Sequence, residues 1–179
     1  EPDGSIPVVA NNYRGRRLNR PNDVVVKSDG KIYFTDPGFP TPGLDLDFNG
    51  VYQVTPDLGT ITLISWNFSR PNGLAFSPDE GILYVANTRE AMYIAAYAIQ
   101  ADGSVANGRV FADISSDETD CTPDGMKVDE EDRVYCTGPG GCWVFDASGN
   151  KLGTIRLPEI PSNCAWGGPD YKTMFFTAR

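Results

Sequence analysis

The sequence predicts an all-β fold, a β-propeller, to which this chain contributes about three and a half blades of roughly 50 residues each. Three observations predict it. The 19 Gly and 14 Pro residues indicate many tight turns. Short runs of β-branched and aromatic residues lie between these turns, with no convincing helical period. A motif with Asn or Asp ahead of an apolar run recurs four times, three times directly after Pro.

The four copies of this motif mark the start of each predicted blade. They occupy residues 20–36, 70–87, 122–138 and 162–178, and their anchoring residues are Asn22, Asn72, Asp124 and Asn163. Each copy consists of an apolar run, a turn rich in Asp, Gly or Pro, and a second run that contains an aromatic residue. This pattern is typical of a β-hairpin. Because the apolar runs are nearly continuous, we expect these strands to be covered on both faces.

A second hairpin follows each of the first three copies. These hairpins join Val51–Val54 to Thr60–Ile64, Ile94–Ile99 to Arg109–Phe111, and Cys142–Phe145 to Leu152–Leu157. Two hairpins per repeat give four antiparallel strands every 40–50 residues, roughly the period of a propeller blade. A β-sandwich has a comparable strand count but gives no reason for the Asn or Asp motif to recur ahead of one strand in each unit.

The phase of the repeat predicts an incomplete ring. Residues 1–18 are expected to form one outer hairpin with its turn at Glu1–Ser5, and the chain ends after the second strand of the fourth copy. We therefore expect residues 1–179 to be part of a single propeller domain, incomplete at both ends and closed by the remainder of the propeller. An open arc of this size would otherwise expose strand edges and sheet faces.

Charge and composition exclude several functions. The formal net charge of −9 argues against a nucleic-acid partner, which requires a clustered basic surface. The chain has no histidine, which excludes Ser-His-Asp and Cys-His catalysis and histidine-bound zinc. No apolar run reaches the roughly 20 residues that cross a bilayer, so no membrane partner is expected. Localisation stays open between the cytoplasm and the periplasm or exterior.

The four cysteines carry no metal-binding spacing. Cys121, Cys136, Cys142 and Cys164 form no C-x-x-C pair and have no histidine neighbours. We expect buried or partly buried free thiols.

The repeated anchors predict a functional site. In a propeller the innermost strands surround a central channel, so equivalent positions of successive blades converge at its mouth. Asn22, Asn72 and Asp124 would then form a ring of amide and carboxylate oxygens, which suit Ca²⁺, Mg²⁺ or Mn²⁺. The alternative is that each anchor only forms an Asx turn ahead of its strand.

The motifs also resemble a known family. The most specific stretches are Leu18–Asp23, Asp29–Pro37, Arg70–Ser77, Pro123–Met126 and Asn163–Asp170. They resemble the SMP-30/gluconolactonase (regucalcin-like) family of six-bladed propeller lactonases. The resemblance implies a central metal held by Asn72, Asp124 and a Glu whose position lies upstream of this chain. It also implies that Asn22 contacts metal or substrate and that Arg20 contacts substrate.

The function implied by the resemblance is metal-dependent hydrolysis of a sugar lactone. The metal would polarise the lactone carbonyl, and Asp124 would hold the metal or act as general base on the attacking water. Ca²⁺ is the first choice of cation, with Zn²⁺, Mg²⁺ and Mn²⁺ as alternatives. Two other functions stay open: a non-catalytic propeller that binds a ligand or partner, and phosphotriester hydrolysis on a similar calcium site.

Two features have competing interpretations. Arg20 either orients sugar hydroxyls or belongs to an exposed basic patch with Arg14, Arg16 and Arg17. The long loop Pro37–Gly50, which contains Asp45 and Asp47, is a lid, a second cation site or a solvated loop.

Overall fold

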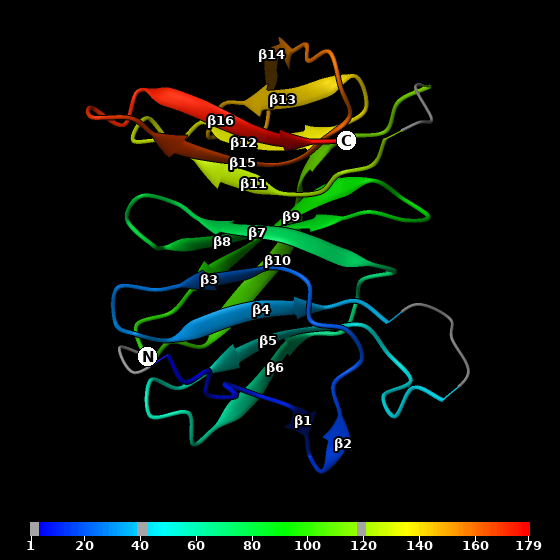
Figure 1. Ribbon diagram of the computed structural model, residues 1–179, viewed down its shortest axis with the longest axis vertical. Coiled ribbons are helices and arrows are strands. Elements are labelled where there is room, and N and C mark those ends of the chain that lie inside the picture. Colours follow the sequence, from blue (N-terminus) through cyan, green and yellow to red (C-terminus); the bar gives the residue numbers. More distant parts are fainter. Residues whose placement is uncertain (1–3, 39–42, 118–120) are drawn as a thin grey trace.

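The computed structural model describes residues 4–38, 43–117 and 121–179. All regular elements within these ranges are β-strands, arranged as successive antiparallel sheets along the long axis of the molecule (Figure 1). The described residues include no helix that could cross a bilayer.

Three of the sheets have four strands and follow the chain order, as the two-hairpin repeat predicts. The first blade contains β3 (Val24–Val26), β4 (Ile32–Asp36), β5 (Gly50–Val54) and β6 (Ile61–Ser65). The second contains β7 (Pro71–Phe76), β8 (Ile82–Asn87), β9 (Tyr93–Ile99) and β10 (Val105–Asp113). The third contains β11 (Met126–Val128), β12 (Val134–Gly138), β13 (Gly141–Phe145) and β14 (Lys151–Ile155).

The fourth copy of the motif forms half a blade, the hairpin of β15 (Pro161–Gly167) and β16 (Thr173–Ala178). The first strands of neighbouring blades contact one another: β3 contacts β7, β7 contacts β11, and β11 contacts β15. These four strands are therefore innermost, which confirms the predicted β-propeller arrangement of the chain.

The N-terminal hairpin differs from its prediction. β1 (Asn12–Tyr13) and β2 (Arg16–Arg17) form a two-stranded hairpin that turns at Arg14 and Gly15, both with positive φ. The turn expected at Glu1–Ser5 lies partly outside the described residues, and Gly4 to Asn11 contain no strand. The expectation of one hairpin over residues 1–18 is wrong because Arg14-Gly15 supplies the left-handed turn that a short hairpin requires.

Apolar side chains fill the space between successive blades. Buried residues between the first and second blades include Tyr33, Val51, Leu74, Leu83 and Val85, and those between the second and third include Tyr84, Ala86, Ile94, Met126, Val134 and Phe145. Burial on both faces explains the nearly continuous apolar runs of β4, β8 and β12. In β3 the expectation fails, since Val24 and Val26 are 57% and 62% exposed on the face turned away from the second blade.

Asp side chains stabilise four of the hairpin turns. Asp57, Asp79, Asp102 and Asp146 accept hydrogen bonds from the N–H groups of Gly59, Gly81, Ser104 and Ser148. Hydrogen bonds from the side chains of Thr55, Ser77, Ser104 and Asn150, together with these N–H groups, lower the pKa of the four carboxyls. The turns are thus Asx turns that depend on ionised carboxylates.

Candidate functional site

Three of the four anchors converge at one end of the innermost strands. Asn22 precedes β3, Asn72 lies at the start of β7, and Asp124 precedes β11. Asn22 Nδ2 donates a hydrogen bond to Asn72 Oδ1, and the Asn72 amide lies close enough to the Asp124 carboxyl to lower its pKa. Asn72 Nδ2 also lies 3.4 Å from the carbonyl oxygen of Pro123. The structure therefore brings together three polar side chains from three successive blades.

The fourth anchor does not join this group through its oxygen. Asn163 Oδ1 accepts the N–H of the next residue, Cys164, at 2.8 Å. Its side chain instead packs against Gly125.

The glycine of the motif is required by close packing between blades. A Cβ on Gly73 would lie 2.1 Å from the backbone oxygen of Asp124, and a Cβ on Gly125 would lie 2.2 Å from Asn163 Oδ1. Neither glycine has a positive φ. The Gly73 N–H donates to the Asp124 oxygen at 3.1 Å, so this approach positions Asp124 beside Asn72.

Threonines in the second strand, or directly after it, connect each blade to the next anchor. Thr35 Oγ1 donates to the carbonyl of Asn72 at 2.9 Å, and Thr88 Oγ1 donates to the carbonyl of Pro123 at 3.0 Å. Thr137 Oγ1 lies 3.3 Å from the carbonyl of Ser162. All three hydroxyls are buried. This role was not predicted from the sequence, although Thr35 and Thr137 occupy equivalent positions two residues after the repeated Tyr.

Asp36 holds the backbone ahead of the first anchor. Its carboxylate accepts the N–H groups of Asn19 at 2.8 Å and Arg20 at 2.5 Å, and burial raises its pKa. In the second blade, Asn87 Oδ1 accepts the N–H of Arg70 at 2.9 Å. Neither contact was predicted from the sequence. The Arg20 side chain is exposed two residues before Asn22, which is compatible with either interpretation offered for it.

Asp124 is half-buried, and this burial raises the pKa of its carboxyl. The hydrogen bond from Asn72 opposes this shift, as do the charges of Arg179 and Arg70, whereas the Asp23 carboxylate adds to it. Asp124 also lines a small cavity of about 150 Å³ with Arg89, Ser162 and Arg179. The carboxylate thus combines access to a cavity with a proton affinity above that of an ordinary Asp.

The anchor group offers donors of the type that hard cations select. It supplies two amide groups and one carboxylate, and amide and carboxylate oxygens bind Ca²⁺, Mg²⁺ and Mn²⁺. No set of three or more His, Cys, Asp or Glu residues that could hold a metal occurs in the part of the chain that the structure describes. The residues present therefore fit a hard cation through amide oxygens and a single carboxylate.

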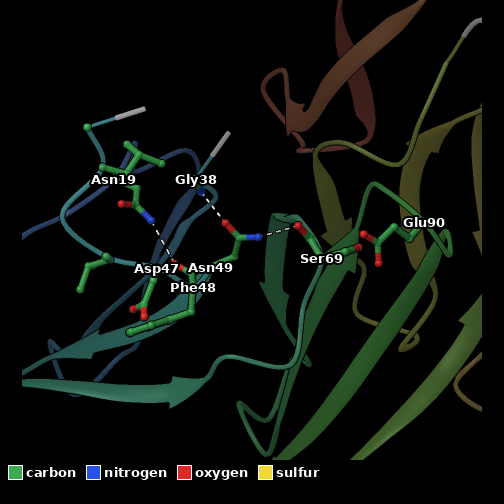
Figure 2. A pocket seen from close by; sticks show the side chains of 10 residues that line it. Asn19, Gly38, Asp47, Phe48, Asn49, Ser69 and Glu90 are labelled. Atoms are coloured by element: carbon green, nitrogen blue, oxygen red, sulfur yellow. Dashed lines mark hydrogen bonds between the residues drawn. The ribbon is translucent and has the colours of Figure 1, made fainter. Parts of the chain in front are cut away.

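A larger cavity of about 460 Å³ is lined by Asn19, Asn49, Ser69 and other residues, and by none of the three anchors (Figure 2). Asn49 bridges its walls: Oδ1 accepts the Gly38 N–H at 2.6 Å, and Nδ2 donates to the Ser69 carbonyl at 2.5 Å. Gly38 and Gly43, which line this cavity, flank residues 39–42 in the sequence, and those four residues are outside the described ranges. We place the candidate site at the anchors, because polar groups of three blades converge there.

The two acids of the 37–50 loop have partners within the protein. Asp47 forms an ion pair with Arg16 at 3.2 Å, and Asp45 Oδ2 accepts the N–H of Arg17 at 3.0 Å. Both contacts join the loop to the β1–β2 hairpin. They favour the interpretation of a solvated loop over that of a second cation site.

A partial propeller with an amide and carboxylate cluster at one end of its innermost strands belongs to the class of propellers that carry a polar site at the channel mouth. A family model described as "SMP-30/Gluconolactonase/LRE-like region" matches residues 1–179. The chain belongs to this SMP-30/gluconolactonase family, as the motifs predicted.

Individual relatives support the same assignment. The chain is 37% identical over 184 residues to a gluconolactonase of Zymomonas mobilis, covering 96% of this chain and 51% of that protein. It is 32% identical to a pentonolactonase of Haloferax volcanii, covering 87% and 52%. A solved gluconolactonase of Xanthomonas campestris superposes with a TM-score of 0.87 at 36% identity, covering 99% and 60%. The chain thus spans about half the length of the curated relatives that it matches.

Proposed function

We propose that the protein containing this chain is a metal-dependent lactonase that opens a sugar lactone to the corresponding aldonic acid. The observation that carries the proposal is the convergence of Asn22, Asn72 and Asp124 from three blades in a member of the SMP-30/gluconolactonase family. The relatives named as gluconolactonase and pentonolactonase support the substrate class.

The proposed cation is divalent, with Ca²⁺ first and Zn²⁺, Mg²⁺ and Mn²⁺ as alternatives, and Asn22, Asn72 and Asp124 would hold it. When bound, the cation supplies Lewis-acid polarisation of the lactone carbonyl. Asn72 Oδ1 accepts a hydrogen bond from Asn22 in the structure, so Asn22 must rotate its amide to present oxygen beside Asn72. The amide of Asn22 is exposed, which leaves room for that rotation.

Asp124 is proposed as general base on the attacking water. Burial raises its pKa and so makes the carboxylate a better proton acceptor, whereas a bound cation would oppose this shift. The water proton passes to the carboxylate and the carbonyl carbon gains the hydroxyl. The bond from this carbon to the ring oxygen then breaks, and the ring oxygen takes the proton back from Asp124 to become the alcohol of the open acid. Arg20 and Asn22 are proposed to orient the hydroxyls of the sugar.

The test uses the full-length protein and D-glucono-δ-lactone, with acid release followed by pH-stat. We expect chelator to abolish turnover, Ca²⁺ to restore it, and Asp124→Asn to reduce kcat by about 10²–10⁴-fold, the usual contribution of a general base. Asn72→Ala should also lower activity, whereas Asn163→Ala, whose oxygen faces its own backbone, is the matched control.

Turnover that resists chelator, or an Asp124→Asn variant of undiminished activity, would contradict the proposal. Binding of the lactone without turnover would favour the non-catalytic alternative, and faster cleavage of a phosphotriester would favour the third function.

A further inference from the structure

The backbone contacts of the β15–β16 hairpin show which residue takes the fourth anchor position. In the second blade, the N–H of Gly73, the residue after Asn72, donates at 3.1 Å to the carbonyl of Asp124, the anchor of the next blade. In the third blade, the N–H of Gly125, the residue after Asp124, donates at 2.8 Å to the carbonyl of Ser162. The carbonyl of Ser162 therefore takes the place that an anchor carbonyl takes at the preceding seam.

The hydrogen bonds between the two ends of each hairpin give the same register. In the second blade, the N–H of Thr88 donates at 3.0 Å to the carbonyl of Arg70, two residues before the anchor. In the fourth unit, the N–H of Arg179 donates at 3.0 Å to the carbonyl of Ile160. Ile160 lies two residues before Ser162, so this contact also places Ser162 at the anchor position.

The threonine contacts agree with this register. Thr35 Oγ1 lies 2.9 Å from the carbonyl oxygen of the anchor Asn72, and Thr137 Oγ1 lies 3.3 Å from the carbonyl oxygen of Ser162. Asn163 therefore follows the anchor position by one residue. This shift explains why the Asn163 side chain does not join the other anchors, although its residue type matches theirs.

Ser162 lines the same small cavity as Asp124. This cavity of about 150 Å³ is also lined by Arg89, which follows β8 of the second blade, and by Arg179. Because its lining comes from three successive units of the propeller, it lies at the end of the innermost strands and not on the outer face of β16, which a further blade would cover. Hydroxyl, carboxylate and guanidinium groups together supply the acceptors and donors that bind the hydroxyls of a sugar.

The Ser162 hydroxyl keeps the capacity to accept a further hydrogen bond. Its Oγ lies 2.8 Å from Thr177 Oγ1 and 3.3 Å from the carbonyl oxygen of Thr177. Since a serine hydroxyl has one proton and two acceptor lone pairs, these contacts leave a lone pair for a ligand. We propose that Ser162 is a substrate-binding residue that accepts a hydrogen bond from a hydroxyl of the sugar lactone beside Asp124. This inference rests on the proposed lactonase function.

The experiment measures the Kd of the full-length protein for 1,5-anhydro-D-glucitol by ligand-observed NMR titration in the presence of Ca²⁺. This ring carries the hydroxyls of D-glucono-δ-lactone but no carbonyl, so its binding is measured without turnover. We expect Ser162→Ala to raise the Kd by about 3–10-fold, the contribution of one neutral hydrogen bond. Ser162→Thr keeps a hydroxyl and should recover most of the lost affinity. Asn163→Ala, at the next residue, is the matched control and should leave the Kd unchanged.

Monodeoxy analogues of the same ring separate direct binding from a structural effect. The analogue without the bound hydroxyl should bind the native protein and Ser162→Ala equally, whereas a purely structural role would weaken the binding of every analogue by the same factor.

Three results would overturn the proposal: an unchanged Kd in Ser162→Ala, a larger effect of Asn163→Ala than of Ser162→Ala, or no binding of the ring to the native protein. If the ring binds through Ser162 but D-glucono-δ-lactone is not hydrolysed, the proposed function fails and the binding role of Ser162 stands.

Discussion

At the scale of single residues, the motif Pro-Asn/Asp-Gly combines two separate requirements. The Asn or Asp presents a polar side chain at the end of the innermost strands, and the Gly lets the neighbouring blade approach that side chain. Gly73 and Gly125 are needed for this approach and not for an unusual backbone conformation. A sequence motif that resembles a turn is thus explained by packing between blades.

Replacement of Gly73 by Ala tests this explanation. The new Cβ would lie 2.1 Å from the Asp124 oxygen, so we expect a loss of about 1–3 kcal/mol in the free energy of unfolding. Urea denaturation followed by tryptophan fluorescence measures this loss. Gly153→Ala on β14 is the matched control, because a Cβ there meets nothing within 4 Å. Equal stability of the two variants would show that the approach at Gly73 is not tight.

At the scale of elements, the seams between blades depend on buried hydroxyls. Thr35 Oγ1 donates to Asn72 and accepts the N–H of Asp23 at 3.2 Å. Thr35→Val keeps the shape of the side chain but leaves these two backbone groups without this partner. We expect a loss of about 1–3 kcal/mol, measured by urea denaturation, together with reduced lactone turnover. Thr62→Val, at an exposed position of the outermost strand β6, should change neither.

The four hairpin turns that contain an Asp carboxylate predict a second property: the folded protein loses stability in acid. Hydrogen bonds lower the folded-state pKa of Asp57, Asp79, Asp102 and Asp146, so the unfolded chain binds more protons than the folded chain near these pKa values. Their contribution is present above the ordinary Asp pKa of about 4 and is lost as the pH falls through the lowered values. The burial-raised pKa values of Asp36 and Asp124 act in the opposite direction.

The measurement is the urea midpoint between pH 7 and pH 3. We expect the urea concentration at the midpoint to decrease once the pH is below about 4. Replacement of Asp79 and Asp146 by Asn should make this decrease shallower. An unchanged slope in the double variant would assign the acid sensitivity to other groups.

The blades were predictable from the sequence because each blade forms its hairpins with similar residue types at equivalent positions. Hairpins such as Val51–Val54 to Thr60–Ile64 carry their turn signals within a few residues. The bridging role of Asn49 depends on segments that meet only after folding, so no local pattern shows it. The position of the N-terminal hairpin was not predictable, because Arg14 in its turn adopts a positive φ that its residue type does not favour. The convergence of Asn22, Asn72 and Asp124 was predictable from the repeat, but the hydrogen bond of Asn163 to its neighbour Cys164 was not.

At the scale of the whole molecule, both ends of the arc expose apolar sheet faces. Val24 and Val26 lie on the outer face of the first blade, and Phe175 is 57% exposed on β16. The predicted remainder of the propeller would cover these faces in the complete protein. The chain is thus expected to be part of a ring, in agreement with the half-length coverage of its relatives.

Val24→Lys in the full-length protein tests ring closure. If a further blade covers Val24, the substitution buries an unpaired charge and should cost about 3–5 kcal/mol of unfolding free energy. Val110 is 61% exposed on the outermost strand β10, so Val110→Lys should change the stability by less than about 0.5 kcal/mol. Thermal unfolding monitored by circular dichroism gives both values. Equal stability of the two variants would show that Val24 faces solvent in the complete protein.

The threonine contacts described above also decide what can be exchanged between propellers. Thr35 belongs to the first blade by sequence, yet the residue whose carbonyl it holds, Asn72, belongs to the second. Thr88 and Pro123 are related in the same way across the next seam. A single blade moved into another propeller at its sequence boundaries would therefore lack the threonine hydroxyl that hydrogen-bonds to the backbone at its anchor, because that threonine belongs to the preceding blade. The modular unit of this propeller, for recombination or for design, begins in the second strand of one blade and ends in the first strand of the next.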